Sequence, residues 1–192
     1  MILVTGAGKG LGRAVAQALA AEGAIVAAND VSPVNLDETV RCILAAGGCV
    51  KAYVEDIAKR MPVQALVQSV VSEWGKLDGL VNCAEVEPRF PVLDMDDWDW
   101  QRTIDVNLTG AFLLTQAAAI VMRGQRGGII IHVGERAKAE EERVAYWTSK
   151  AGLAMMVKRT SQELADFRVQ VFLVRPVEGE DTVSTICSLF IK

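Results

Sequence analysis

A glycine-rich turn directly after the first apolar segment constrains the fold of this chain more than any other feature. The segment Met1–Val4 is apolar and suits a buried strand, and an alanine-rich helical pattern at Leu11–Glu22 follows the turn. The turn reads Thr5-Gly6-Ala7-Gly8-Lys9-Gly10-Leu11-Gly12. Glycines at this junction let the backbone approach a pyrophosphate, whose charge then lies at the N-terminus of the helix. The alternative interpretation is a strand-to-helix turn with a structural role alone.

Strand and helix patterns alternate along the rest of the chain. Strands are predicted at Met1–Val4, Ala24–Asn29, Cys49–Val54, Gly79–Asn82, Gly128–Val133 and Val169–Val174. Helices are predicted at Leu11–Glu22, Asn35–Ala46, Met61–Trp74, Asp96–Arg123 and Ala145–Asp166. This alternation implies right-handed crossovers and an α/β fold, a Rossmann-type, doubly wound parallel sheet of about six strands. The strands are almost continuously apolar, as expected when helices cover both faces.

The size and charge of the chain exclude several classes of protein. A length of 192 residues suits one α/β domain spanning residues 1–192. The 24 acidic and 20 basic residues give a net charge of −4, which argues against nucleic-acid and anionic-membrane partners. No apolar run reaches the roughly 18 residues of a membrane span, and no basic region precedes the first apolar segment as in a secretion signal. We therefore expect a cytoplasmic protein.

Cysteine and histidine usage favours neither a metal centre nor a disulfide scaffold. The four cysteines, Cys42, Cys49, Cys83 and Cys187, form no CxxC pair. The single histidine, His132, ends the apolar run Ile129–Ile131, so a core histidine is a better interpretation than a hydrolase base. An acidic cluster could suggest a metal site, but acids at a helix N-terminus explain it better. That cluster comprises Asp94, Asp96, Asp97 and Asp99, with Trp98 and Trp100.

An acidic residue, Asp30, follows the second predicted strand. It lies 18 residues after Gly12 (30 − 12). A carboxylate at this position can accept hydrogen bonds from both hydroxyls of an adenosine ribose, and it would repel a 2′-phosphate. Because Val31 comes next, no arginine is adjacent to hold that phosphate. The pattern favours NAD over NADP.

A tyrosine and a lysine, Tyr146 and Lys150, lie four residues apart at the start of a predicted helix. This spacing places them on one helical face, about 6 Å apart along the axis. An ammonium group near a phenol favours the phenolate, which can exchange a proton with an alcohol while hydride moves to or from nicotinamide. The alternative is a packed tyrosine beside a solvated lysine.

With these motifs in order, the chain resembles the short-chain dehydrogenase/reductase family, of the classical type, from Thr5 to Phe190. The family's TGxxxGxG motif matches Thr5, Gly6, Gly10 and Gly12. Its NNAG segment is represented by Asn82-Cys83-Ala84-Glu85. The resemblance implies catalytic roles for Tyr146, Lys150 and Asn107. It implies cofactor contacts from Thr5, Gly6, Lys9, Gly10, Leu11, Gly12, Asp30, Asp56, Ile57, Asn82, Ala84, Tyr146, Lys150 and Pro176.

Several positions depart from the family's pattern. The catalytic serine of the family aligns with Gly134, and losing one such hydroxyl donor typically costs about 10²–10³ in rate. Glu85 stands where the motif has glycine, close to the expected nicotinamide, and Val177 replaces a glycine after Pro176. The segment from Glu180 resembles the family's late helix, so the substrate-covering loop is almost wholly absent. We therefore expect an open, wet site.

Two function classes remain open on this pattern. One is an NAD-dependent oxidoreductase acting on a small alcohol or carbonyl compound, with Tyr146 as acid/base, Lys150 binding ribose, and Asn107 holding a proton-relay water. The other is a non-catalytic NAD-binding or interaction protein of the same fold, which Gly134 and Glu85 favour. We also expect a homodimer or homotetramer formed through the Asp96–Arg123 and Ala145–Asp166 helices. The sequence predicts no bound metal.

Overall fold

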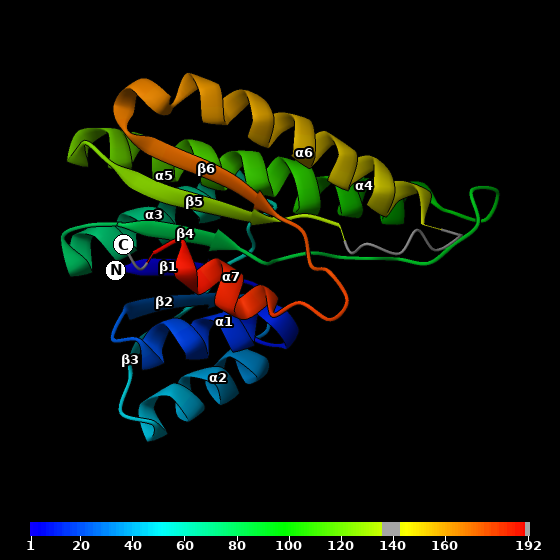
Figure 1. Ribbon diagram of the computed structural model, residues 1–192. Coiled ribbons are helices and arrows are strands. Elements are labelled where there is room, and N and C mark those ends of the chain that lie inside the picture. The colour runs from blue at the N-terminus through cyan, green and yellow to red at the C-terminus, as the bar shows by residue number, and fades with distance from the viewer. Residues whose placement is uncertain (136–142, 191–192) are drawn as a thin grey trace.

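Six parallel strands form one sheet at the centre of the protein (Figure 1). The computed structural model describes residues 1–135 and 143–190. The strands are β1 (Ile2–Thr5), β2 (Ile25–Asp30), β3 (Cys49–Val54), β4 (Gly79–Asn82), β5 (Gly128–Val133) and β6 (Val169–Val174). Their order, β3-β2-β1-β4-β5-β6, is that of doubly wound dinucleotide-binding folds. The predicted fold class and all six predicted strands are confirmed, with ends shifted by at most one residue.

Helices cover both faces of this sheet (Figure 1). One face packs against α1 (Gly10–Ala21), α2 (Pro33–Ala45) and α7 (Thr182–Ser188). The other packs against α3 (Arg60–Trp74), α5 (Ala111–Gln125) and α6 (Val144–Glu163). Successive strand residues point to opposite faces, so Leu3 enters one apolar core while Val4 enters the other. Burial on both faces explains why the strands read as continuous apolar runs.

The long helix predicted at Asp96–Arg123 is interrupted. It consists of α4 (Asp97–Ile104), a π-helical turn η1 (Asp105–Gly110) and α5. The π turn, which inserts an extra residue and is frequent at functional sites, contains Asn107. The helical stretch Asp97–Gln125 is long and apolar enough to cross a membrane by composition, but half of its most apolar window is buried inside the protein. Helices in the cores of water-soluble proteins meet the same criterion.

The helical pattern at Ala145–Asp166 also divides, into α6 and a short 3₁₀ turn η2 (Ala165–Phe167). The late helix predicted from Glu180 begins slightly later as α7, where Asp181 accepts hydrogen bonds from the backbone N–H groups of Val183 and Ser184. Only residues 175–181 connect β6 to α7. The expectation of a short segment in this region is therefore confirmed.

A buried chain of polar side chains joins the central strands to α5. The Thr5 hydroxyl donates to Asn82 Oδ1 (2.6 Å), and Asn82 Nδ2 lies 3.2 Å from His132 Nδ1. His132 Nε2 lies 2.9 Å from Thr115 Oγ1, which donates to the Ala111 carbonyl. Each group has a partner if His132 is neutral and protonated on Nε2. Burial, with a smaller contribution from the Lys150 charge, lowers the pKa of His132 to about 3. His132 is thus a core residue, as the sequence predicts.

The neutral state of His132 makes stability depend on pH. Its folded-state pKa, about 3, lies below the value of about 6.5 in an unfolded chain, so the unfolded state binds the proton first as pH falls. We expect the free energy of unfolding to fall by on the order of 1 kcal/mol per pH unit below about 6.5. Urea unfolding from pH 7 to pH 5 measures this, and His132→Asn should remove the histidine-dependent slope. An equal slope in both proteins would contradict the assignment.

Candidate active site

A cavity of about 380 Å³ lies at the carboxyl ends of the strands. Its walls come from the turn after β1, the ends of β2 and β5, and the segments that follow β3, β4 and β6. The strand order reverses between β1 and β4, and ligands of doubly wound sheets bind at this reversal. Its volume lies within the range of small-molecule sites, roughly 300–1,000 Å³.

The glycine turn packs so closely that a Cβ at Gly6, Gly8 or Gly12 would lie within 3 Å of another atom. A Cβ on Gly12 would lie 2.1 Å from the Gly6 carbonyl oxygen, and one on Gly8 would lie 2.7 Å from Asp30 Oδ2. The Arg13 guanidinium stabilises the turn by donating a hydrogen bond to the Gly8 carbonyl. Lys9, at the N-cap of α1, makes no capping side-chain hydrogen bond. Backbone N–H groups in the first turn of α1 are therefore open to an anion such as a pyrophosphate.

Three acidic residues, Asp30, Glu55 and Asp56, line the end of the cavity beside β2 and β3. Asp30 accepts from the backbone N–H groups of Gly8 and Ser32, both at 2.9 Å. Its remaining lone pairs are available to ribose hydroxyls. Asp56 accepts from the Ala58 N–H (3.1 Å) and pairs with Arg102 (3.2 Å). The donors and acceptors of this cavity therefore fit the adenosine and pyrophosphate parts of a dinucleotide.

Tyr146, Lys150 and Asn107 come together near the other end of the cavity. The Lys150 ammonium lies 5.4 Å from the centre of the Tyr146 ring and donates to the Val133 carbonyl at 3.0 Å. Asn107 Nδ2 donates to the Ser149 hydroxyl (3.1 Å), which itself donates to the Tyr146 carbonyl (2.7 Å). Residues from α6, the π turn η1 and the end of β5 thus meet around Tyr146.

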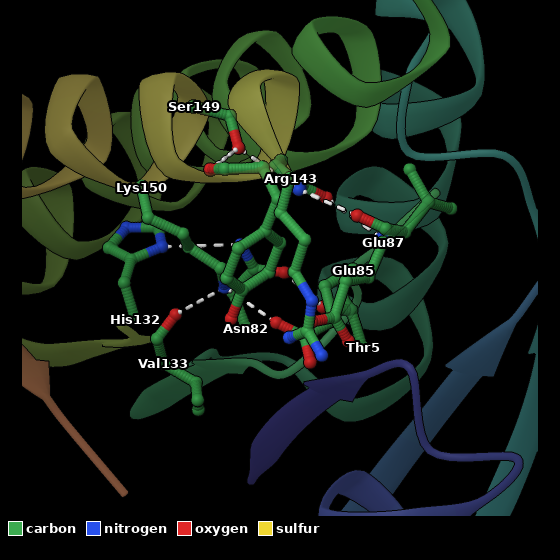
Figure 2. A network of polar contacts seen from close by, with 12 residues as sticks. Thr5, Asn82, Glu85, Glu87, His132, Val133, Arg143, Ser149 and Lys150 are labelled. Carbon is green, nitrogen blue, oxygen red and sulfur yellow. Dashed lines mark hydrogen bonds and ion pairs between the residues drawn. The ribbon is translucent and has the colours of Figure 1, made fainter. Parts of the chain in front are cut away.

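Glu85 forms an ion pair with Lys150, with Oε2 and Nζ 2.7 Å apart (Figure 2). The Glu85 side chain is 24% exposed and lines the cavity, whereas that of Lys150 is only 4% exposed. Of these three site residues, Glu85 lines the cavity, whereas Lys150 and Tyr146 are not among its described lining residues. Burial, and secondarily the Glu85 carboxylate, raise the pKa of the nearby Cys83 thiol to about 12. The Glu85 carboxylate therefore lies between the cavity and the lysine.

The open site expected from the sequence is wrong for Tyr146 and Lys150, which are only 2% and 3% exposed. The segment after β4 contacts the start of α6 close to these two residues. Its Glu87 pairs with Arg143 at the start of α6 (Figure 2). Phe90 forms a backbone bridge with the same arginine. Both contacts attach the segment after β4 to Arg143, which lies three residues before Tyr146 in the chain.

Most of the residues that the resemblance assigns to a cofactor line the cavity. They are Gly6, Lys9, Gly10, Leu11, Gly12, Asp30, Asp56, Ile57, Ala84 and Pro176. Thr5 and Asn82 instead lie behind it, fully or almost fully buried in the polar chain that ends at Thr115. Arg102 lines the cavity without having been singled out in the sequence, because no local pattern links it to Asp56. Within residues 1–135 and 143–190, no group of three or more potential ligands could hold a metal ion.

Comparisons with known proteins agree with this architecture. The pattern of the family described as short chain dehydrogenase matches residues 1–184. The 3-oxoacyl-acyl-carrier-protein reductase FabG of Thermotoga maritima is 36% identical over 176 residues, covering 91% of this chain and 72% of that protein. The 2,3-dihydro-2,3-dihydroxybenzoate dehydrogenase of Bacillus subtilis is 33% identical, covering 92% of this chain and 69% of its own length. A metagenomic short-chain oxidoreductase, solved in complex with NADP, superposes with a TM-score of 0.94 at 30% identity, covering 100% of this chain and 91% of that one.

The packing of the turn predicts unequal costs for two glycine substitutions. In Gly12→Ala the new methyl group meets a backbone carbonyl that cannot rotate away, so we expect a loss of about 3 kcal/mol in the free energy of unfolding. Gly10→Ala meets no atom within 4 Å and bears only the strain of its positive φ, about 1 kcal/mol. Urea unfolding of both variants measures the difference. Equal costs would show that the turn is not packed as described.

Proposed function

Because the chain belongs to the short-chain dehydrogenase family, we propose that it transfers hydride between NAD and the carbon atom of a small alcohol or carbonyl compound. The observation that carries this proposal is the pairing of Tyr146 with Lys150 beside a cavity that presents a glycine turn and Asp30. Residues 1–192 would act as a single dinucleotide-binding domain. The non-catalytic alternative is not favoured, because the relatives named above are reductases and dehydrogenases.

The cavity wall suggests which residues hold the cofactor. The first N–H groups of α1 would bind the pyrophosphate, and Asp30 would accept the hydroxyls of the adenosine ribose. Asp56 and Ile57 line the cavity where the adenine would lie. When bound, the nicotinamide ring accepts or supplies the hydride. The reacting end of the cavity would then lie beside Glu85 and Gly134, near Tyr146.

Tyr146 would move the proton that accompanies the hydride. In alcohol oxidation, the hydroxyl proton passes to the Tyr146 phenolate oxygen while the C–H bond gives up its hydride, so a carbonyl compound and a phenol result. In the reverse direction the phenol returns the proton to the new alkoxide oxygen. The Lys150 ammonium favours the phenolate, and Asn107 would hold a proton-relay water at the π turn.

Gly134 leaves the substrate oxygen without the hydroxyl donor that the family places here. The space around it is limited, since a Cβ would lie 3.0 Å from Arg175 Cγ and 3.3 Å from Leu173 Cγ. Arg175 in turn pairs with Glu135 (2.5 Å). Polarisation of the substrate would therefore rest on Tyr146, and turnover would be at least about 10²-fold below what the scaffold could support.

We also propose that the protein is cytoplasmic and self-associates through the surface formed by α4, α5 and α6. Large apolar side chains are exposed there, with Ile120 at 59% and Phe112 at 42%. Apolar patches of this kind commonly mark subunit interfaces. A homodimer or homotetramer would bury them.

The position of Asp30 predicts the cofactor preference. Its carboxylate repels a 2′-phosphate, so NAD(H) should bind at least about tenfold more tightly than NADP(H), a difference of about 1.4 kcal/mol. Calorimetric titration of both cofactors measures the ratio. Asp30→Ala should bring the ratio of the two dissociation constants closer to one. Asp37→Ala, which removes an exposed carboxylate on α2, should leave this ratio unchanged. Equal or tighter binding of NADP(H) to the unmodified protein would overturn the assignment.

Restoring a hydroxyl at position 134 should raise the rate. We expect Gly134→Ser to increase kcat/KM by about 10²-fold over Gly134→Ala, which fills the same space without a donor. The assay follows NADH absorbance with a panel of simple alcohols. If the serine variant is no faster than the alanine variant, another group polarises the substrate. If Tyr146→Phe leaves the rate unchanged, the proton-transfer mechanism is wrong.

A further inference from the structure

The reacting end of the cavity presents a negative charge rather than the positive charge of the lysine. The described residues that line this end follow β4, lie at or just after the end of β5, or follow β6. They are Cys83, Ala84, Glu85, Val86, Val133, Gly134 and Pro176. Glu85 is the charged member of this set. Lys150 lies behind it, held by the Val133 carbonyl at 3.0 Å and by Glu85 at 2.7 Å. The ion pair therefore directs its carboxylate end toward the cavity.

Within the part of the chain that the structure describes, several titratable groups near this end are paired with one another or neutral. Glu87 pairs with Arg143, and Glu135 pairs with Arg175. Cys83 stays a neutral thiol because its pKa is raised to about 12. The Glu85 carboxylate contributes to that shift, after burial. The other charged lining residues are at the glycine turn (Lys9), at the adenosine end (Asp30, Glu55, Asp56) or paired with Asp56 (Arg102).

We propose that Glu85 makes this end of the cavity select a cationic ring, so that the protein binds oxidised nicotinamide in preference to the reduced form. This inference rests on the proposed dinucleotide binding. The oxidised ring carries one positive charge and the reduced ring carries none, so a carboxylate facing the ring attracts only the former. Were residue 85 uncharged, the Lys150 charge would be uncompensated and would disfavour the cation. At equal concentrations of the two forms, Glu85 thus raises the fraction of the protein that carries the oxidised cofactor.

Calorimetric titration with NAD⁺ and with NADH tests the proposal without any turnover. The quantity compared is the ratio of the two dissociation constants, Kd(NAD⁺)/Kd(NADH), in which effects on the shared parts of the cofactor cancel. We expect Glu85→Gln to raise this ratio at least about tenfold, equivalent to about 1.4 kcal/mol. Glu85→Asp, which keeps the charge, should stay near the ratio of the unmodified protein.

Glu87→Gln is the matched control, since it neutralises a paired carboxylate on the same segment that is not among the described lining residues. Its ratio should not change. ADP-ribose, which lacks the ring, must still bind each variant and so verifies that the cavity has folded. If Glu85→Gln does not fold, Glu85→Gly takes its place with the same expected rise.

Two outcomes would overturn the inference. The ratio could stay within twofold in the neutral variants, including the case in which both dissociation constants change by one common factor, as for a residue that only obstructs the cavity. The ratio could also rise equally in Glu87→Gln. The proposed function fails separately, if the folded, unmodified protein binds neither dinucleotide nor ADP-ribose.

Discussion

The close approach of the glycine turn to the strand ends on either side of it is the constraint on which the rest of the site depends. A Cβ at Gly6 would lie 2.7 Å from the Ala84 backbone after β4, and a Cβ at Gly8 would lie 2.7 Å from Asp30 at the end of β2. The turn therefore fixes the distance between these two segments. Asp30 and Glu85 then face one cavity from opposite ends, with the N-terminus of α1 between them.

The two main departures from the family's pattern, Glu85 and Gly134, fall at the same end of that cavity. One adds a negative charge and the other removes a neutral donor, so both alter the electrostatics where hydride and proton would be exchanged. The residues at the adenosine end match the cofactor-binding motifs of the family. A chain of this kind would retain cofactor binding while changing which redox state it prefers and how fast it reacts.

Much of the architecture could be predicted from the sequence, because it rests on local patterns. Continuous apolar runs such as Gly128–Val133 mark strands buried on both faces, and glycines mark the turn. The π turn at Asn107 could not be predicted, since its backbone pattern is set by packing rather than by residue type. The Glu85–Lys150 pair and the burial of Tyr146 could not be predicted, because both depend on how segments far apart in the chain pack together. The sequence showed that Glu85 and Gly134 depart from the family's pattern, but not that Glu85 pairs with Lys150.

If Glu85 selects the oxidised ring, its carboxylate must stay between the cofactor and Lys150. A crystal structure of the protein with bound NAD⁺ tests it directly. We expect the Glu85 carboxylate to remain paired with Lys150 and to face the nicotinamide half of the cofactor, while Asp30 contacts the adenosine ribose. A structure in which Glu85 has swung away and Lys150 bonds directly to the nicotinamide ribose would contradict it.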